Sequence, residues 1–184
     1  MQTTYFTADL HLGHQGIIDH CYRPFTSVEE MDNTIIDNIN HVVKPKDALW
    51  VLGDFSLRSF SHVQAYRDRI KCSTVHLVRG NHDGLTVTQY KTLFTSVSEL
   101  KEIKVEQQRI TLCHYAMRRW NKSHLGSWHL YGHSHGCLNG NGTLSFDVGV
   151  DARCYSPLSF EEVAHLMRNM EIMGAKAEEN HPTC

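Results

Sequence analysis

The sequence TYFTADLHLGH, residues 4–14, decides the fold, because in it a short apolar run ends in residues of the types that bind metals. Residues 3–8 are expected to form a buried strand, and Asp9 and His11 follow at its carboxyl end. Side chains at i and i+2 of an extended chain point to the same side, so both can reach one ion. Similar polar clusters follow other apolar runs, at Gly53-Asp54, Gly80-Asn81-His82-Asp83, Cys113-His114 and Gly132-His133-Ser134-His135.

The spacing of apolar residues predicts an α/β protein with two sheets. Besides residues 3–8, strands are expected at residues 48–52, 74–78, 109–112, 128–131 and 144–150. Helical periodicity predicts helices at residues 27–43, 60–70, 87–94 and 159–173. Two Asn-Gly pairs predict a tight hairpin between Cys137 and Thr143. Strand and helix alternate in the first half of the chain, and the second half is richer in strand.

Length limits how many domains the chain can form, and net charge limits which partners it can attract. The 184 residues suit a single domain, expected at residues 1–173, with a flexible C-terminal tail at residues 174–184 where the apolar periodicity is lost. The 18 Lys and Arg nearly balance the 20 Asp and Glu, so no global charge attracts a polyanion or a membrane surface. Nucleic acid is therefore not favoured as a partner, although it is not excluded.

The N-terminus and the cysteines indicate the compartment. The sequence has no signal-peptide pattern at its start and no window apolar enough to cross a bilayer. The six cysteines are scattered without a C-x-x-C pair, which argues against a zinc ribbon or a redox dithiol and favours reduced thiols. We therefore expect a soluble, cytoplasmic protein with no membrane partner.

The polar clusters supply the donors that a pair of divalent metals needs. If the preceding runs are neighbouring strands, their carboxyl ends bring the clusters to one edge of the sheet. A mixture of imidazole nitrogen and carboxylate or amide oxygen suits divalent metals. Asp54 is expected to bridge two ions, because a carboxylate can do so and a neutral imidazole cannot. The expected ligands are Asp9, His11, Asp54, Asn81, His114, His133 and His135.

The ordered motifs D-x-H, G-D, G-N-H-D, H and G-H-x-H resemble those of the calcineurin-like metallophosphoesterase superfamily, from Tyr5 to about Asp151. The chain is most similar to short bacterial and phage phosphoesterases, through residues 7–14, 23–25 and 130–136. The resemblance implies a two-sheet β-sandwich flanked by helices, in four layers α/β/β/α. It also implies a first metal on Asp9, His11, Asp54 and His135, and a second on Asp54, Asn81, His114 and His133.

This donor set predicts a dinuclear, metal-dependent hydrolase of phosphate monoesters or diesters. Two divalent ions outweigh the charges of Asp9, Asp54 and a bridging hydroxide, so the centre attracts phosphoryl oxygens. The expected reaction is in-line attack of the metal-bridging hydroxide on a small or nucleotide-like substrate. His82 is placed to donate a proton to the leaving alkoxide. Mn²⁺ is the expected metal, with Fe²⁺, Zn²⁺ and Ni²⁺ as alternatives.

Residues outside the ligand set are candidates for holding the substrate: Arg58, His14, Arg23 and Arg118. Arg58 lies four residues after Asp54, the spacing of a phosphate-contacting Arg in related phosphoprotein phosphatases. Leu57 departs from their G-D-x-x-D-R pattern, which speaks against a phosphoprotein substrate. Each candidate also has a plainer interpretation, as a surface ion pair, a local hydrogen-bonding residue or a solvated charge. Asp83 is expected to cap the segment after it, or else to orient His82.

Two other functions stay open. A nuclease acting on DNA or RNA would use the same chemistry, although the near-neutral charge does not favour it. A catalytically silent scaffold would use the metals only to organise a protein partner, and the presence of His82 argues against this function. The sequence leaves the native substrate and the oligomeric state undetermined.

Overall fold

The computed structural model describes residues 2–138 and 143–179, and it contains two β-sheets. The first sheet has the strand order β4-β3-β2-β1-β9. Its first four strands are parallel, and β9 pairs with β1 in the antiparallel sense. These strands are β1 (Thr4–Thr7), β2 (Ala48–Val51), β3 (Thr74–Val78), β4 (Ser96–Ser98) and β9 (Leu158–Ser159).

The second sheet has the order β5-β6-β7-β8. Strands β5 and β6 form an antiparallel hairpin, whereas β6, β7 and β8 are parallel. A parallel bridge between Ala8 and Gly149 joins the chain after β1 to the chain after β8. The strands are β5 (Leu100–Val105), β6 (Gln108–Cys113), β7 (Trp128–Tyr131) and β8 (Ser145–Asp147).

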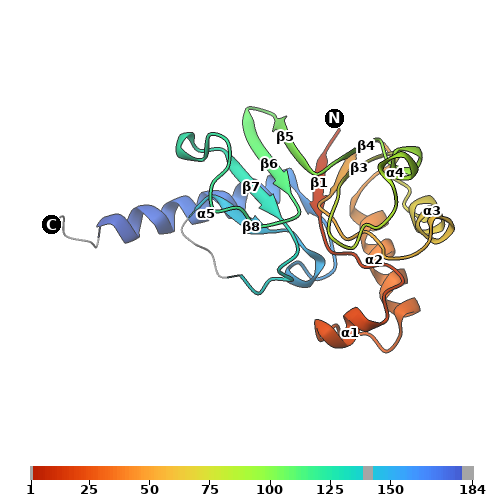
Figure 1. Ribbon diagram of the computed structural model, residues 1–184. Helices are drawn as coiled ribbons and strands as arrows, with labels where there is room; N and C mark the ends of the chain where they lie inside the picture. Colours follow the sequence, from red (N-terminus) through yellow and green to blue (C-terminus); the bar gives the residue numbers. More distant parts are fainter. Residues whose placement is uncertain (1, 139–142, 180–184) are drawn as a thin grey trace.

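Helices flank the sheets, as Figure 1 shows. Helices α2, α3 and α4 lie on the side of the first sheet that faces away from the second sheet, and α5 packs against β1 and β9. The α-helices are α1 (Gly16–His20), α2 (Val28–Val42), α3 (Phe60–Arg69), α4 (Val87–Leu93) and α5 (Phe160–Glu179). Two 3₁₀ turns are η1 (Ser123–Leu125) and η2 (Val150–Ala152).

Strand alternation divides the interior into two cores. Leu49 and Val51 of β2 pack on the helix side with the apolar stripe of α2, which includes Ile35 and Ile39. The intervening Trp50 packs between the sheets with residues of β6, β7 and β8. Successive side chains of a strand point to opposite faces, so a strand that is covered on both faces needs apolar residues at successive positions. Both faces of the first sheet are therefore buried, and its polar residues collect at the strand ends.

The predicted fold class, two sheets flanked by helices, is confirmed, and all six predicted strands and four predicted helices are present. The sequence did not indicate β4, β5, β9 or α1. Strand β5 reads LKEIKV, and only Ile103 and Val105 are partly buried, as expected of a charged edge strand. Among the described residues, no helix is long and apolar enough to cross a membrane.

The predicted end of one helix needs correction. Helix α5 continues to Glu179, beyond the predicted end at Met173, because residues 174–179 contain good helix formers such as Ala175 and Ala177. The predicted turn at residues 139–142 lies outside the described residues, as do residues 180–184. The flanking strands β7 and β8 run parallel, so they are not the arms of a hairpin.

Candidate metal centre

The predicted ligands meet at the carboxyl ends of the parallel strands, in two groups. In each group the ligand atoms lie within 4.8 Å of one another. Asp54 stands between the groups, since its Oδ2 is 3.4 Å from His11 Nε2 and 3.4 Å from His114 Nε2. The groups are Asp9, His11 and His135, and Asp54, His114 and His133.

The backbone at these positions is unusual. Five of the seven predicted ligands have a left-handed backbone, with φ between 47° and 66°. This conformation costs roughly 1–2 kcal/mol per residue outside glycine. Such strain persists only where the surroundings impose it, and it concentrates at functional sites. The five residues are Asp9, His11, Asp54, His133 and His135.

Asp9 is fully buried at the junction of the two sheets. Its carboxylate accepts hydrogen bonds from the backbone N–H of His133, at 3.0 and 2.9 Å. A Cβ atom at Gly132 would lie 2.7 Å from Asp9 Oδ2, so only glycine allows this approach. Burial raises the pKa of Asp9 to about 7, and the neighbouring His135 and His114 offset this effect only in part. A cation would supply further compensating charge.

His11 provides the most direct test of whether the site fits a metal. Its Nε2 atom is buried and has no hydrogen-bond partner among the described residues, which is costly in a folded protein. Burial lowers the pKa of His11 to about 3, so the ring is neutral and has a free lone pair. His11 Nε2 lies 3.4 Å from Asp54 Oδ2. A neutral imidazole nitrogen beside a carboxylate oxygen is an arrangement in which both atoms can coordinate one cation.

His114 is oriented in the same way. Its Nδ1 donates to the carbonyl of Leu52 at 2.8 Å, so Nε2 is directed toward Asn81 Oδ1 at 3.0 Å and toward Asp54 Oδ2. Burial would lower the pKa of His114, but its hydrogen bond with Asp54 and that carboxylate's charge raise it overall. The imidazole, amide and carboxylate donors therefore converge on one point, as they would around an ion.

Arg23 and Asp151 form hydrogen bonds that hold the first donor group, Asp9, His11 and His135, in place. His135 Nδ1 donates to Asp151 Oδ2 at 2.7 Å, and Arg23 binds both oxygens of Asp151 at 2.8 Å. The same guanidinium donates to the carbonyls of Asp9 and Leu10, which fixes the D-x-H turn. Burial would raise the pKa of Asp151, but these hydrogen bonds lower it overall, so it stays ionised.

Arg23, predicted to hold the substrate, lies outside the pocket beside the predicted ligands. The side chain is buried, and its N–H groups are occupied by Asp151, two carbonyls and the sulfur of Met31. Its role is to position ligands, as outer partners of metal-binding residues commonly do.

Asp83 also differs from its prediction. It neither caps α4, whose N-cap is Thr86, nor contacts His82 through any hydrogen bond. Its buried carboxylate accepts from the backbone N–H groups of Asp54, Phe55 and Gly80, at 2.9, 3.0 and 2.9 Å. Burial raises the pKa of Asp83 to about 6. This residue ties the G-D turn to the G-N-H-D turn.

A pocket of about 580 Å³ opens beside the two groups. His82 and His14 both line it. The backbone N–H of His82 donates to Asp54 Oδ1 at 2.9 Å, and the His82 ring centroid is 5.2 Å from that of His11. His82 is thus beside the predicted ligands without belonging to either group. The lining residues are His11, His14, Gly16, Ile17, His20, Asp54, His82, His133 and His135.

The other two arginine candidates do not line this pocket. Arg58 is exposed and lies against Gly13, one residue before His14. Arg118 is exposed and lines a separate cavity on the loop between β6 and β7, so any contact it makes with substrate lies outside the pocket beside the predicted ligands.

Sequence patterns did not indicate several residues of the site. Asp151 ends the apolar run 144–150, so the rule that flagged Asp9 could have found it. Tyr115 follows His114 at the rim, and its ring centroid is 4.9 Å from that of His133. Gly16, Ile17 and His20 reach the pocket only through α1, which the periodicity did not indicate.

Imidazole and carboxylate donors at the carboxyl edge of a two-sheet α/β sandwich define a metal-dependent phosphoesterase. The chain belongs to the calcineurin-like phosphoesterase superfamily, because residues 6–149 match the family model described as the calcineurin-like phosphoesterase superfamily domain.

The chain is also similar to three proteins, each from a different organism. An uncharacterized protein, MJ1445, from Methanocaldococcus jannaschii is 28% identical over 182 residues, covering 94% of this chain and 96% of its own. The gene 66 protein of Mycobacterium phage L5 is 33% identical over 118 residues, covering 57% of this chain and 56% of its own. The crystal structure of a protein of unknown function, AQ665 from Aquifex aeolicus, has a TM-score of 0.73 at 24% identity, covering 90% of this chain and all of its own. It shares the fold.

Proposed function

We propose that the site holds two divalent ions that share Asp54. The observation that carries the proposal is the position of the Asp54 carboxylate, 3.4 Å from a histidine nitrogen of each donor group. The ligand-free Nε2 of His11 and the convergence of His114 with Asn81 support it. The first ion would bind Asp9, His11, Asp54 and His135, and the second Asp54, Asn81, His114 and His133.

The reaction is hydrolysis of a phosphate ester by in-line displacement. Two divalent ions held by these residues would lower the pKa of a bound water molecule and neutralise charge on phosphoryl oxygens. The water oxygen forms a bond to phosphorus while the bond to the ester oxygen breaks. His82 lines the pocket beside Asp54 and donates a proton to the departing alkoxide. The products are an alcohol and a phosphate, or a phosphate monoester when the substrate is a diester.

The substrate class is a small or nucleotide-like phosphate monoester or diester. A pocket of about 580 Å³ is in the usual range for small-molecule sites. His14, whose Nδ1 is 3.5 Å from His11 Nδ1, projects into this pocket and would contact the substrate beside the ions. Mn²⁺ is the proposed metal, and Fe²⁺, Zn²⁺ and Ni²⁺ suit the same donors.

The test is turnover by protein loaded with Mn²⁺. We expect hydrolysis of p-nitrophenyl phosphate or of its bis ester, with a loss of about 10²–10⁴-fold in kcat for His82→Ala. His41→Ala, an exposed histidine on α2, is the matched control and should retain activity. Absence of turnover of both esters, or an unaffected His82→Ala variant, would contradict the proposal.

A further inference from the structure

The loop between β6 and β7 carries two arginines, Arg118 and Arg119, that have no acidic partner among the described residues. Between Glu106 and Asp147 the sequence contains no Asp or Glu, although it contains Arg109, Arg118, Arg119 and Lys122. Arg118 and Arg119 are exposed, and neither side chain has an ion pair or hydrogen bond within the described part of the chain. In a protein of net charge −2, this is a local basic surface rather than a general one.

The backbone that presents these two arginines is fixed on both sides. The N–H of Met117 donates to Nε2 of the buried His129 at 3.1 Å, and Trp120 Nε1 donates to the carbonyl of Ser127 at 3.0 Å. Both guanidinium groups line a cavity of about 560 Å³. Its other lining residues are Trp120, Ser123, His124, Thr143 and Leu144. Less backbone ordering is therefore needed when a ligand binds.

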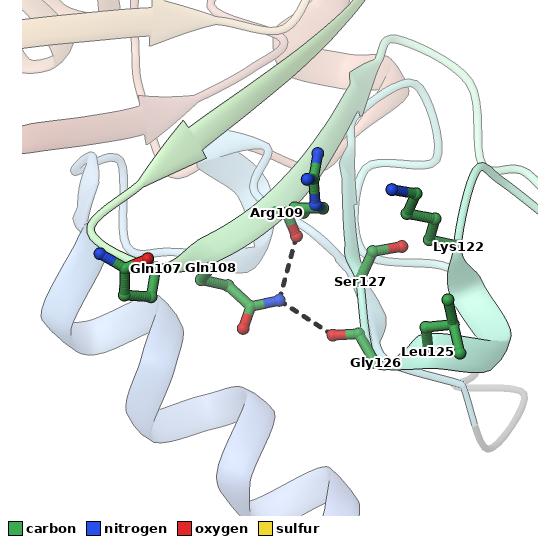
Figure 2. Close-up of a pocket in the computed structure, with 7 residues that line it drawn as sticks. All are labelled: Gln107, Gln108, Arg109, Lys122, Leu125, Gly126 and Ser127. Carbon is green, nitrogen blue, oxygen red and sulfur yellow. Dashed lines mark hydrogen bonds between the residues drawn. The ribbon is translucent and has the colours of Figure 1, made fainter.

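A second cavity borders the other side of η1, and Figure 2 shows it. Gln108 Nε2 donates to the carbonyl of Gly126 at 2.9 Å and so links the β5–β6 hairpin to the loop. The side chains of Arg109 and Lys122 point to the same side of this cavity. Glu102 lines a small cavity together with Arg109 and Lys122 and accepts from Asn121 Nδ2 at 3.0 Å, so the basic surface without an acidic neighbour is limited to Arg118 and Arg119.

Tyr115 connects this surface with the metal centre. Its side chain is 45% exposed, and its ring lies edge-on to His114 and His133, with centroids 5.0 and 4.9 Å away. Arg118 is three residues further along, a span of at most about 11 Å. The order along the loop is therefore a predicted metal ligand, an exposed aromatic ring and then unpaired cations.

We infer that the nucleotide-like phosphodiester bound at this centre is part of a single-stranded nucleic acid. A base next to the scissile phosphate stacks on Tyr115, and Arg118 and Arg119 bind the backbone phosphates beyond it. The inference rests on the proposed function and names its substrate class. A small phosphate ester would leave the separate arginines unused, whereas a strand presents phosphates at intervals and unpaired bases between them. Positive grooves with exposed aromatic rings are the usual features of single-strand binding.

The test compares two double variants with the same change in charge. Arg118→Ala/Arg119→Ala removes the unpaired arginines, and Lys46→Ala/Lys91→Ala removes two exposed lysines near the first sheet. Binding of a fluorescein-labelled ten-nucleotide DNA, the RNA of the same sequence and the DNA duplex is measured by anisotropy between 50 and 200 mM salt. All proteins carry His82→Ala, so that turnover does not consume the probe. The unmutated protein is assayed in parallel on p-nitrophenyl phosphate.

We expect the arginine variant to reduce the slope of log K against log salt by about 1.4, since each phosphate contact on a single strand contributes about 0.7. The lysine variant should leave the slope unchanged. Tyr115→Ala should weaken binding by about 5- to 150-fold at an unchanged slope, which is the contribution of one stacked base. Comparison of the DNA and RNA probes shows which kind of single-stranded nucleic acid binds more tightly.

Equal slopes in the two double variants would overturn the inference, as would tighter binding of the duplex than of the single strand. Failure of every oligonucleotide to bind, while the unmutated protein hydrolyses p-nitrophenyl phosphate, would overturn it and leave the proposed function intact. Binding with the expected slopes but no hydrolysis of any ester would contradict the proposed function instead.

Discussion

The two donor groups of the centre differ in how they are held. Asp9 and His11 are buried, and His135 is fixed by Asp151, which is itself bound by Arg23. We call these five residues the inner half. In the outer half, His114 is buried, but Asn81 and His133 are exposed and His82 lines the pocket. The outer half is thus more open to solvent than the inner half, and we expect substrate to enter from its side. Asp54 belongs to both.

The largest effect is expected at the shared residue. Asp54→Asn removes the negative charge and the bridging geometry, so both ions should be lost and turnover should become unmeasurable. Bound metal by plasma mass spectrometry and kcat/KM for p-nitrophenyl phosphate check this. Asp37→Asn, at an exposed position on α2, is the matched control. Retention of two ions by the Asp54 variant would mean that the halves do not share this carboxylate.

In the outer half, His82→Ala should lower kcat by about 10²–10⁴-fold, because the leaving alkoxide loses its proton donor. Metal content should stay as in the unmutated protein, since His82 belongs to neither donor group. A substrate with a strongly acidic leaving group needs less protonation and should lose less activity. Equal losses for substrates with weak and with acidic leaving groups would argue against the proton-donor role.

In the inner half, Asp151→Asn should weaken metal binding by about 10–100-fold, because it removes the partner that orients His135 and leaves Arg23 without its buried counter-ion. The kcat of fully loaded protein should change much less. Competition with a fluorescent chelator measures the affinity. A variant that binds metal normally but has a reduced kcat would reverse the roles assigned to the two halves.

The smallest effect is expected at the pocket wall. His14→Ala should raise KM by about 2- to 10-fold, the contribution of one hydrogen bond, and leave kcat and metal content nearly unchanged. Initial-rate measurements over a range of substrate concentrations check this. A loss of bound metal would instead place His14 in the inner half, next to His11.

Much of the site follows from residues that end strands. Asp9, Asp54 and His114 each come within three residues of the end of a strand, and parallel strands bring their carboxyl ends to one edge. Periodicity and motif order were therefore enough to predict which side chains meet. They also predicted the helix at Val28–Val42, whose N-cap Ser27 accepts from the N–H of Glu30.

The supporting contacts could not be predicted in this way. Arg23 and Asp151 are 128 residues apart, and nothing local indicates that a guanidinium will be buried between a carboxylate and the carbonyls of the D-x-H turn. Asp83 likewise binds the backbone of Asp54, 29 residues away, instead of the helix that follows it. Such contacts depend on how the turns pack in three dimensions, which periodicity does not encode.

The central claim is that one carboxylate joins two cations. Titration of metal-free protein with Mn²⁺, followed by electron paramagnetic resonance, tests this claim most directly. We predict two equivalents bound per chain and a magnetically coupled spectrum, with the coupling lost in Asp54→Asn. A single equivalent, or two equivalents that give only uncoupled signals, would contradict the claim.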